Sequence, residues 1–211
     1  MKIAIISAME KEFEFVSKCC SSKGHTLYPA ISGIAKVNAA ITALQMIIDK
    51  RPDCIINTGV AGGLGNNVRM GDVVIGAENA YHDVWCGEGY DGGQVQGLPT
   101  RFPADPELLA KASQIKLDTP VHTGLICSGD QFLLTHESEE KILKLFLDAL
   151  ACDMESAAMA HVCFLKKVPF LSFRIISDTH SEGLGEEMYN DFWEHVSENS
   201  FNVVNSIIDS L

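Results

Sequence analysis

Three carboxylates stand beside apolar stretches in widely separated parts of the chain. Glu12 lies one turn into a helical pattern that follows the first apolar run, Glu155 lies within ACDMESAAMA, and Asp178 follows the run FLSFRIIS. Pairs of carboxyl groups carry out general acid and base catalysis. The apolar neighbours of Glu155 indicate a partly buried carboxylate that needs hydrogen-bond donors, and the hydroxyl groups of a sugar would supply them.

Each of these acids also has an interpretation without catalysis. The helix dipole favours an acid such as Glu12 near a helix N-terminus. Asp178 at a strand end is typical of a cap for the next turn, and Glu155 beside Ser156 is typical of a capping network. The three acids therefore indicate a function only when they are taken together.

Other candidate residues lie in loops that follow apolar runs. The glycine-rich segment Gly59–Gly63 resembles a phosphate-binding loop, but it has neither GK[ST] nor GxGxxG, so we expect its glycines to allow close approach of the backbone. Phe132 in SGDQF is a candidate for stacking on a planar base, although a loop aromatic belongs to the core more often. His82 and His180 are candidate ligands, but we expect each to be a hydrogen-bonded loop residue instead.

Apolar β-branched runs alternate with helical patterns along the chain. Strands are predicted at Lys2–Ile6, Cys54–Thr58, Asp72–Ala80, Thr123–Cys127 and Phe170–Ser177. Helices are predicted at Glu10–Cys19, Val37–Ile48, Pro106–Ser113, Glu137–Phe146, Ser156–Lys166 and Met188–Leu211. In the last helix one apolar stripe is expected from Phe192, Val196, Val203, Ile207 and Leu211.

Strands that are apolar throughout are covered on both faces. We therefore expect an α/β fold, a three-layer sandwich in which helices flank a central mixed β-sheet. In such folds the site lies just past the carboxyl ends of the strands. That rule selects five segments, which hold all three carboxylates: 8–12, 59–63, 128–132, 154–155 and 177–178.

The composition disfavours several classes of binding partner. The 211 residues include 16 basic and 28 acidic side chains, so the formal net charge is −12, which disfavours nucleic acid and anionic membranes. No apolar run reaches the ~18 residues of a membrane span, and the short apolar start does not fit a signal peptide. The seven cysteines lie mostly in apolar runs without CxxC, which favours a reducing cytoplasm and no metal. One domain, residues 1–211, is expected.

Eight stretches of the chain, taken in order, resemble the nucleoside phosphorylase and nucleosidase superfamily, and within it the 5′-methylthioadenosine/S-adenosylhomocysteine nucleosidases. They span nearly the whole sequence: IAIISAMEKE (3–12), SGIAKVNAA (32–40), INTGVAGGL (56–64), GDVVI (71–75), YHD (81–83), GLICSGDQF (124–132), DMESAAMAHVC (153–163) and VPFLSFRIISD (168–178). The resemblance implies a mixed-sheet α/β sandwich without a cofactor, which forms a homodimer and takes a nucleoside and water as its small-molecule partners.

The resemblance also implies roles for residues around the scissile bond. Glu12 matches the residue that polarises the attacking water, and Asp178 matches the acid that protonates or hydrogen-bonds adenine N7. Glu155 matches the residue that binds the ribose hydroxyls, with Met154 beneath the sugar. Arg174 aligns with an arginine near that glutamate, so it is assigned to ribose binding.

The base and the 5′ substituent are assigned by the same resemblance. Phe132 matches an aromatic that stacks on the base, and backbone groups of Leu133 would read the adenine edge. The resemblance assigns contacts with the 5′ substituent to Met9, Ile34, Tyr189 and Pro99. Pro99 would reach the pocket of a partner subunit.

Water is expected as the attacking group rather than phosphate. Phosphorylases of the superfamily carry R-x-G-T-x-G at the glycine segment and a Gly-Arg pair in the first loop, whereas both places lack arginine here. The carboxylate of Glu12 would repel phosphate, and Lys11 alone is a poor substitute for arginine clamps.

Two alternatives stay open beside hydrolysis of methylthioadenosine and S-adenosylhomocysteine. The loop Val84–Tyr90 differs from better-known members, so another 5′-modified nucleoside, such as futalosine or aminodeoxyfutalosine, is a candidate substrate. A non-catalytic nucleoside-binding protein is the third hypothesis, and the presence of all three carboxylates argues against it. Relative to typical members of this family, the chain is shorter by about one β-hairpin between Cys19 and Ser32. Val60 also stands where many members carry Ser or Thr.

Overall fold

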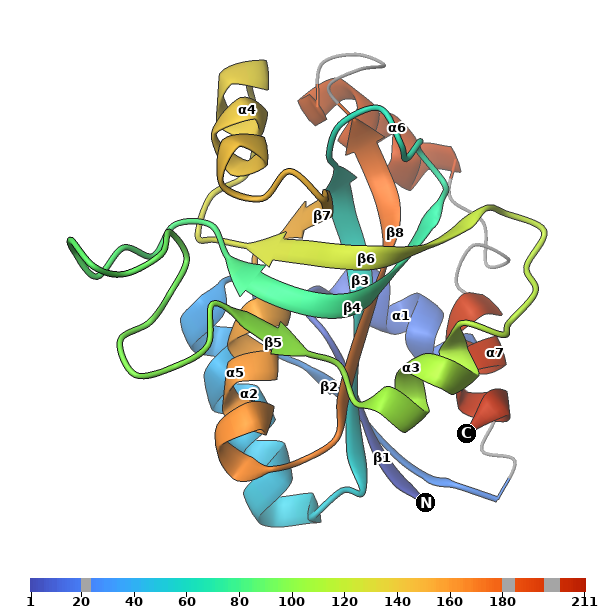
Figure 1. Ribbon diagram of the computed structural model, residues 1–211. Coiled ribbons are helices and arrows are strands. Elements are labelled where there is room, and N and C mark those ends of the chain that lie inside the picture. Colours follow the sequence, from blue (N-terminus) through green and yellow to red (C-terminus); the bar gives the residue numbers. More distant parts are fainter. Residues whose placement is uncertain (20–23, 180–184, 196–201) are drawn as a thin grey trace.

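The computed structural model describes residues 1–19, 24–179, 185–195 and 202–211 (Figure 1). The strands within these ranges are β1 (Lys2–Ser7), β2 (Thr26–Ile31), β3 (Cys54–Gly63), β4 (Val73–Tyr81), β5 (Arg101–Pro103), β6 (Val121–Ser128), β7 (Ala149–Asp153) and β8 (Phe170–Thr179). The helices are α1 (Glu10–Cys19), α2 (Lys36–Lys50), α3 (Pro106–Ala112), α4 (His136–Leu145), α5 (Ser156–Lys166), α6 (Gly185–His195) and α7 (Asn202–Ser210).

The strands form one mixed sheet that bends back on itself. Strand β3 pairs with β8, β8 with β4, β4 with β6, β6 with β7, and β7 with β3, so these strands close a ring. Strands β1 and β2 extend the sheet from β3, and β5 extends it from β4. Parallel and antiparallel pairs both occur, which confirms the predicted mixed sheet.

Helices cover the sheet on two sides, as predicted. In Figure 1, α2 and α5 lie on one side, and α1, α3 and α7 lie on the other. Strand β1 shows why its sequence is apolar throughout: Ile3 and Ile5 join a core with residues of α3, α6 and α7, whereas Ala4 and Ile6 join a core with residues of α2 and α5. Successive side chains of a strand point to opposite faces, so both sets are buried.

The ends of several elements differ from the prediction. Strand β3 continues through Gly59–Gly63, which we had expected to be a loop, because these residues pair with β8 as far as Gly63 and Thr179. Glycine contributes no apolar side chain to the pattern, so the apolar pattern does not indicate this extension. Strands β2, β5 and β7 were not predicted; β2 holds Pro29 and lies at the sheet edge, where proline is tolerated.

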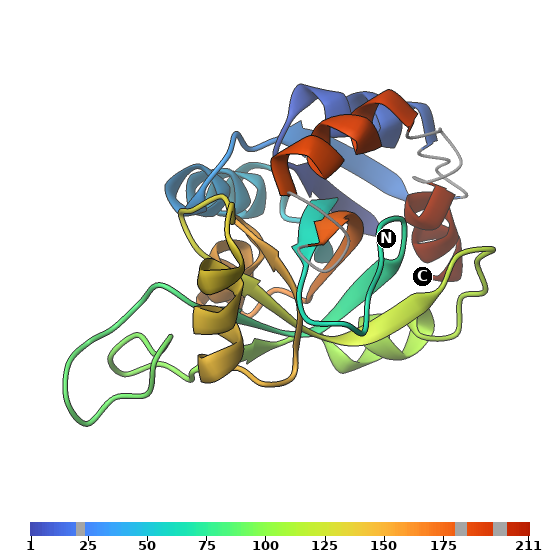
Figure 2. The same ribbon diagram turned by 90° about the horizontal axis from the view of Figure 1, so that it is seen from above.

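The predicted single C-terminal helix, Met188–Leu211, is wrong. The described residues of this range fall in α6 and α7, which occupy different places, with α6 beside α1 (Figure 2). Phe192 on α6 and Val203 and Ile207 on α7 reach the same core, so the apolar stripe arises from two helices. Val196 and the candidate ligand His180 lie outside the described residues. None of the helices in the described ranges has the length and apolar character needed to cross a membrane.

Candidate active site

A pocket lies where the carboxyl-terminal parts of β1, β3, β6, β7 and β8 meet. It encloses about 630 Å³ of empty space including its open mouth. Nine of the eleven residues predicted for the site line it: Met9, Glu12, Ile34, Phe132, Leu133, Met154, Glu155, Asp178 and Tyr189. The wall is completed by Ala8, Val60, Ala61, Gly62, Gln131, Cys152, Asp153 and Ser177.

Glu12 is held by three backbone N–H groups. The N–H groups of Ala8 and Met9 donate to its Oε2 (2.9 and 3.0 Å), and the N–H of Val60 donates to its Oε1 (2.9 Å). Burial raises the pKa of Glu12 above its usual range, although these donors and the charge of Arg174 act in the opposite direction. A carboxylate with a raised pKa is suited to take a proton from water near neutral pH.

Two glycines of β3 bring the backbone close to the two catalytic candidates. A Cβ atom at Gly59 would lie 2.9 Å from Cδ of Glu12, and one at Gly62 would lie 3.3 Å from Oδ2 of Asp178. The two glycines are three positions apart, or about 10 Å of extended strand. Glu12 and Asp178 therefore approach neighbouring parts of one strand and line the same pocket.

Asp178 lies within β8 and not after it. Its carboxylate is buried, and the hydroxyl of Ser177 donates to its Oδ1 (2.6 Å). In the pairing with β3, Ile176 lies opposite Ala61 and Asp178 lies opposite Gly62, so Ser177 falls where the register shifts. This irregularity re-aims the side chains next to the pocket.

Glu155 stands at the start of α5 and reaches across to the segment before α2. Its Oε1 accepts the N–H of Ala35 (2.9 Å). Burial and the nearby charge of Asp153 raise the pKa of Glu155 to about 7. The alternative interpretation of Glu155 as the cap for Ser156 is wrong, because Oδ1 of Asp153 accepts the N–H groups of both residues (3.2 Å each).

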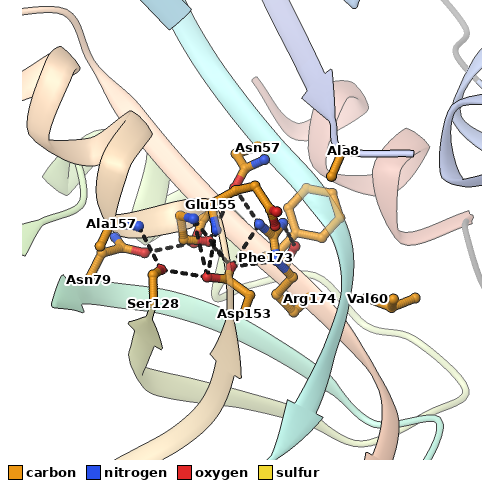
Figure 3. A network of polar contacts seen from close by, with 12 residues as sticks. Ala8, Asn57, Val60, Asn79, Ser128, Asp153, Glu155, Ala157, Phe173 and Arg174 are labelled. Atoms are coloured by element: carbon orange, nitrogen blue, oxygen red, sulfur yellow. Dashed lines mark hydrogen bonds and ion pairs between the residues drawn. The ribbon is translucent and has the colours of Figure 1, made fainter. Parts of the chain in front are cut away.

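Arg174 is buried and is not among the residues that line the pocket, so a direct contact with ribose is not supported. Figure 3 shows it beside Asp153 and Asn57. Its Nε and Nη2 atoms lie 2.8 and 2.7 Å from Oδ2 of Asp153, and Nη2 also donates to Oδ1 of Asn57 (2.5 Å). These partners satisfy the guanidinium within the protein. Pro99 is likewise absent from the lining within this chain.

Sequence reasoning missed Asp153 as a functional candidate, although a signal was present. An arginine inside the apolar run FLSFRIIS must be paired when buried, because an isolated charge is costly there. Asp153 directly precedes the candidate residues Met154 and Glu155, so it is an acid next to a segment that the sequence had already selected. Gln131, another lining residue, carried no comparable signal.

Two aromatic side chains form one wall of the pocket. The rings of Phe132 and Tyr189 meet edge to face with centroids 5.5 Å apart, and the hydroxyl of Tyr189 donates to Sδ of Met9 (3.5 Å). Phe132 is 46% exposed, so its face is accessible to a planar ligand. His82 lies outside the lining, and burial lowers its pKa. Within the described residues, no cluster of His, Cys, Asp and Glu fits a metal ion.

Comparison with known proteins identifies the family. A model described as "Phosphorylase superfamily" matches residues 2–209. The chain belongs to the phosphorylase superfamily. A 5′-methylthioadenosine/S-adenosylhomocysteine nucleosidase of Desulfotalea psychrophila is 36% identical over 230 residues, covering 100% of this chain and 98% of that protein.

Solved structures agree with this placement in the phosphorylase superfamily. The nucleosidase of Neisseria meningitidis, in complex with methylthio-immucillin-A, has a TM-score of 0.90 at 36% identity and covers 100% of this chain and 99% of its own. The futalosine hydrolase of Helicobacter pylori strain 26695 has a TM-score of 0.89 at 25% identity and covers 100% and 98%. The resemblance to the nucleosidases of the superfamily is thereby confirmed.

A first prediction for this phosphorylase-superfamily member concerns Gly59. In Gly59→Ala the new methyl group collides with the Glu12 carboxylate, which three N–H groups hold in place. We expect kcat to fall by about 10-fold or more, since a small displacement of a catalytic group costs much of its effect. The candidate base-binding residues Phe132 and Leu133 are unchanged in this variant, so we expect binding of adenine, the base that the resemblance implies, to persist in calorimetry; loss of binding with unchanged kcat would contradict this.

A second prediction concerns the stability of Glu155→Gln. Because the folded pKa of Glu155 is about 7 and its ordinary value is 4.5, the folded state binds more protons between these values, and stability is lost as the pH rises through them. Glutamine does not ionise. The variant should therefore gain about 2 kcal/mol relative to wild type between pH 5 and pH 8, or about 4–8 °C in Tm. Thermal unfolding of both proteins at the two pH values measures the gain, and an equal Tm difference at both would refute it.

Proposed function

We propose that the protein hydrolyses the N-glycosidic bond of 5′-methylthioadenosine and S-adenosylhomocysteine, releasing adenine and the 5′-thio-ribose. The observation that carries the proposal is the convergence of Glu12, Glu155 and Asp178 on one pocket. The full-length similarity to a nucleosidase supports the choice of substrate. The catalytic unit is the single domain of residues 1–211.

The chemistry follows from the three carboxyl groups. Departure of adenine needs a proton or hydrogen bond at N7, which Asp178 provides, while positive charge develops at C1′ of the sugar. Glu12 takes a proton from water as the water attacks C1′ from the other side. Each of these proton transfers contributes about 10²–10⁴-fold. Glu155 accepts hydrogen bonds from the ribose hydroxyls and so fixes C1′ between the other two groups.

The electrostatics of the pocket favour water over phosphate. Its described lining contains acids and no lysine or arginine. The nearest buried guanidinium, that of Arg174, is bound by Asp153 and Asn57. Phosphate would meet the acidic groups of this lining without a cationic clamp. Hydrolysis is therefore the reaction that this site supports.

Product analysis tests the proposal directly. Purified protein is incubated with 5′-methylthioadenosine, S-adenosylhomocysteine, adenosine, futalosine and aminodeoxyfutalosine, each with and without phosphate, and products are separated by chromatography. We expect adenine and free 5′-thio-ribose from the first two substrates, at rates that phosphate does not increase. A ribose 1-phosphate product would overturn the hydrolase assignment.

A second candidate substrate class is the futalosines. The similarity to a futalosine hydrolase favours it, as does the loop Val84–Tyr90, in which Trp85 is 73% exposed. The same panel decides, because this alternative requires faster cleavage of futalosine or aminodeoxyfutalosine than of methylthioadenosine.

We also propose that the protein is a cytoplasmic homodimer. Helix α2 exposes Val37, Ile41 and Ile48, a pattern typical of an interaction surface. Figures 1 and 2 show a long loop between β4 and β5 that projects from the body, and Pro99 lies in it, where it would reach a partner's pocket. Buried free thiols such as Cys127 fit a reducing compartment. Light scattering tests the dimer, and a fully active monomer would exclude a contribution of Pro99 across subunits.

A further inference from the structure

The buried residues behind Glu155 form a network that the catalytic scheme does not use. Asp153 is its centre: Oδ1 accepts the hydroxyl of Ser128 (2.5 Å), and Oδ2 accepts Nε of Arg174 (2.8 Å). Asp153 also accepts the hydroxyl of Ser156. Figure 3 shows these groups converging from different strands and the start of α5. Asp153 and Arg174 are both buried, so their charges are exposed to little screening by water.

The network fixes the turn that carries Glu155. Asp153 accepts the N–H of Glu155 and of Ser156, which ties the turn between β7 and α5 to the carboxylate. Ser128 closes the other side, since its hydroxyl oxygen accepts the N–H of Ala157 (2.9 Å). The guanidinium of Arg174 in turn holds the carboxylate of Asp153. The backbone of Glu155 therefore has little freedom.

Several charged or titratable groups act on the Glu155 carboxylate from the surrounding elements. They are Glu12 on α1, Asp153 on β7, Arg174 on β8 and Tyr189 on α6. Asp178 on β8 lines the same pocket. From the segment before α2 the Glu155 carboxylate receives only the N–H of Ala35 among the hydrogen bonds of the described residues. The charge of the adjacent Lys36 is neutralised by Asp83 and Asp130. Among the groups that act on Glu155, Arg174 thus carries the positive charge, and Asp153 is its ion-pair partner.

We propose that the Asp153–Arg174 ion pair is a positioning device for Glu155, which sets both the place and the proton affinity of the ribose-binding carboxylate. The ribose-binding part rests on the proposed nucleosidase function. Asp153 disfavours the ionised form of Glu155, whereas Arg174 favours it. Loss of either partner should therefore shift the titration of Glu155, and the two shifts should have opposite signs.

The test uses the full-length protein and compares matched variants. Asp153→Asn and Arg174→Gln each remove one charge, and Arg174→Lys keeps the charge but loses the two-pronged contact. Ser172→Ala is the control, because this buried β8 serine donates to Asn79 away from Glu155. Circular dichroism and thermal unfolding establish that each variant is folded.

The first readout needs no substrate. Protein labelled with ¹³C at the glutamate carboxyl carbons is titrated by NMR, and the Glu155 signal is assigned by its absence from Glu155→Gln. Relative to a midpoint of about 7 in the wild type, we expect a midpoint about one pH unit lower in Asp153→Asn and about one unit higher in Arg174→Gln. Arg174→Lys and Ser172→Ala should stay close to the wild type.

The second readout is the pH profile of kcat/KM for adenine release. The acid limb of this profile should move to lower pH in Asp153→Asn and to higher pH in Arg174→Gln. Arg174→Lys should raise KM and leave the acid limb in place. Midpoints that stay fixed or move in one direction in both charge variants would overturn the proposal.

Two further outcomes keep the test decisive. If Asp153→Asn does not fold, Arg174→Gln and Arg174→Lys decide, and equal Glu155 midpoints in the two would refute the proposal. If the wild type releases adenine from no nucleoside, the proposed function fails, whereas the NMR titration still tests the action of the pair on Glu155.

Discussion

Replacing Asp178 with Asn should lower kcat for adenine release from 5′-methylthioadenosine by about 10²–10⁴-fold. The asparagine side chain has nearly the same shape and retains an oxygen that accepts the hydroxyl of Ser177. It has no carboxyl proton to deliver to N7, so adenine must leave as a poor, anionic leaving group. Initial rates measured by adenine release, with KM determined separately, give the size of the effect.

A matched control separates catalysis from folding. Asp72 is another buried acid, but it lies at the start of β4, where it accepts the N–H of Arg69 and pairs with His122. Asp72→Asn should keep wild-type kcat, whereas Asp178→Asn should lose activity and keep its circular dichroism spectrum. Normal turnover in Asp178→Asn would show that this side chain is not the acid.

Most of the site could be predicted from the sequence because its residues follow apolar strands. Strand ends are recognisable from composition, and the carboxyl ends of parallel strands meet on one side of a sheet. Glu12, Phe132, Glu155 and Asp178 each stand in or beside such a stretch, and the structure places all four around one pocket.

What could not be predicted depends on contacts between distant strands. The extension of β3 through its glycines exists because β8 pairs with it, and a local pattern carries no information on that pairing. Likewise, no local pattern indicates that the N–H of Val60 donates to the carboxylate of Glu12. Arg174 was assigned to ribose binding by resemblance, whereas in the structure this β8 side chain donates to Asp153 of β7.

The C-terminal error has a different physical origin. An apolar residue at every third or fourth position is compatible with one long helix and with two shorter ones, since both bury the same stripe. Phe192 and Val203 do enter one core, but they do so from α6 and α7. Periodicity therefore predicted which side chains are buried and did not predict where the helix ends.

Glu12→Gln should lower kcat by about 10²–10⁴-fold while adenine binding persists. The amide cannot accept a proton from water at neutral pH. It also has one acceptor oxygen in place of two, although Ala8, Met9 and Val60 all donate to the carboxylate. One of these N–H groups would then face the amide nitrogen, so we expect some loss of Tm as well, of a few degrees.

Two comparisons isolate the role of Glu12 as a base from that structural cost. Glu14→Gln changes an exposed acid on the same helix and should leave kcat and Tm unchanged. Glu12→Ala removes the side chain and opens space for a small anion, so added formate should restore part of the rate, as expected when a carboxylate itself is what the reaction lacks. Full activity in Glu12→Gln would refute activation of water by this residue.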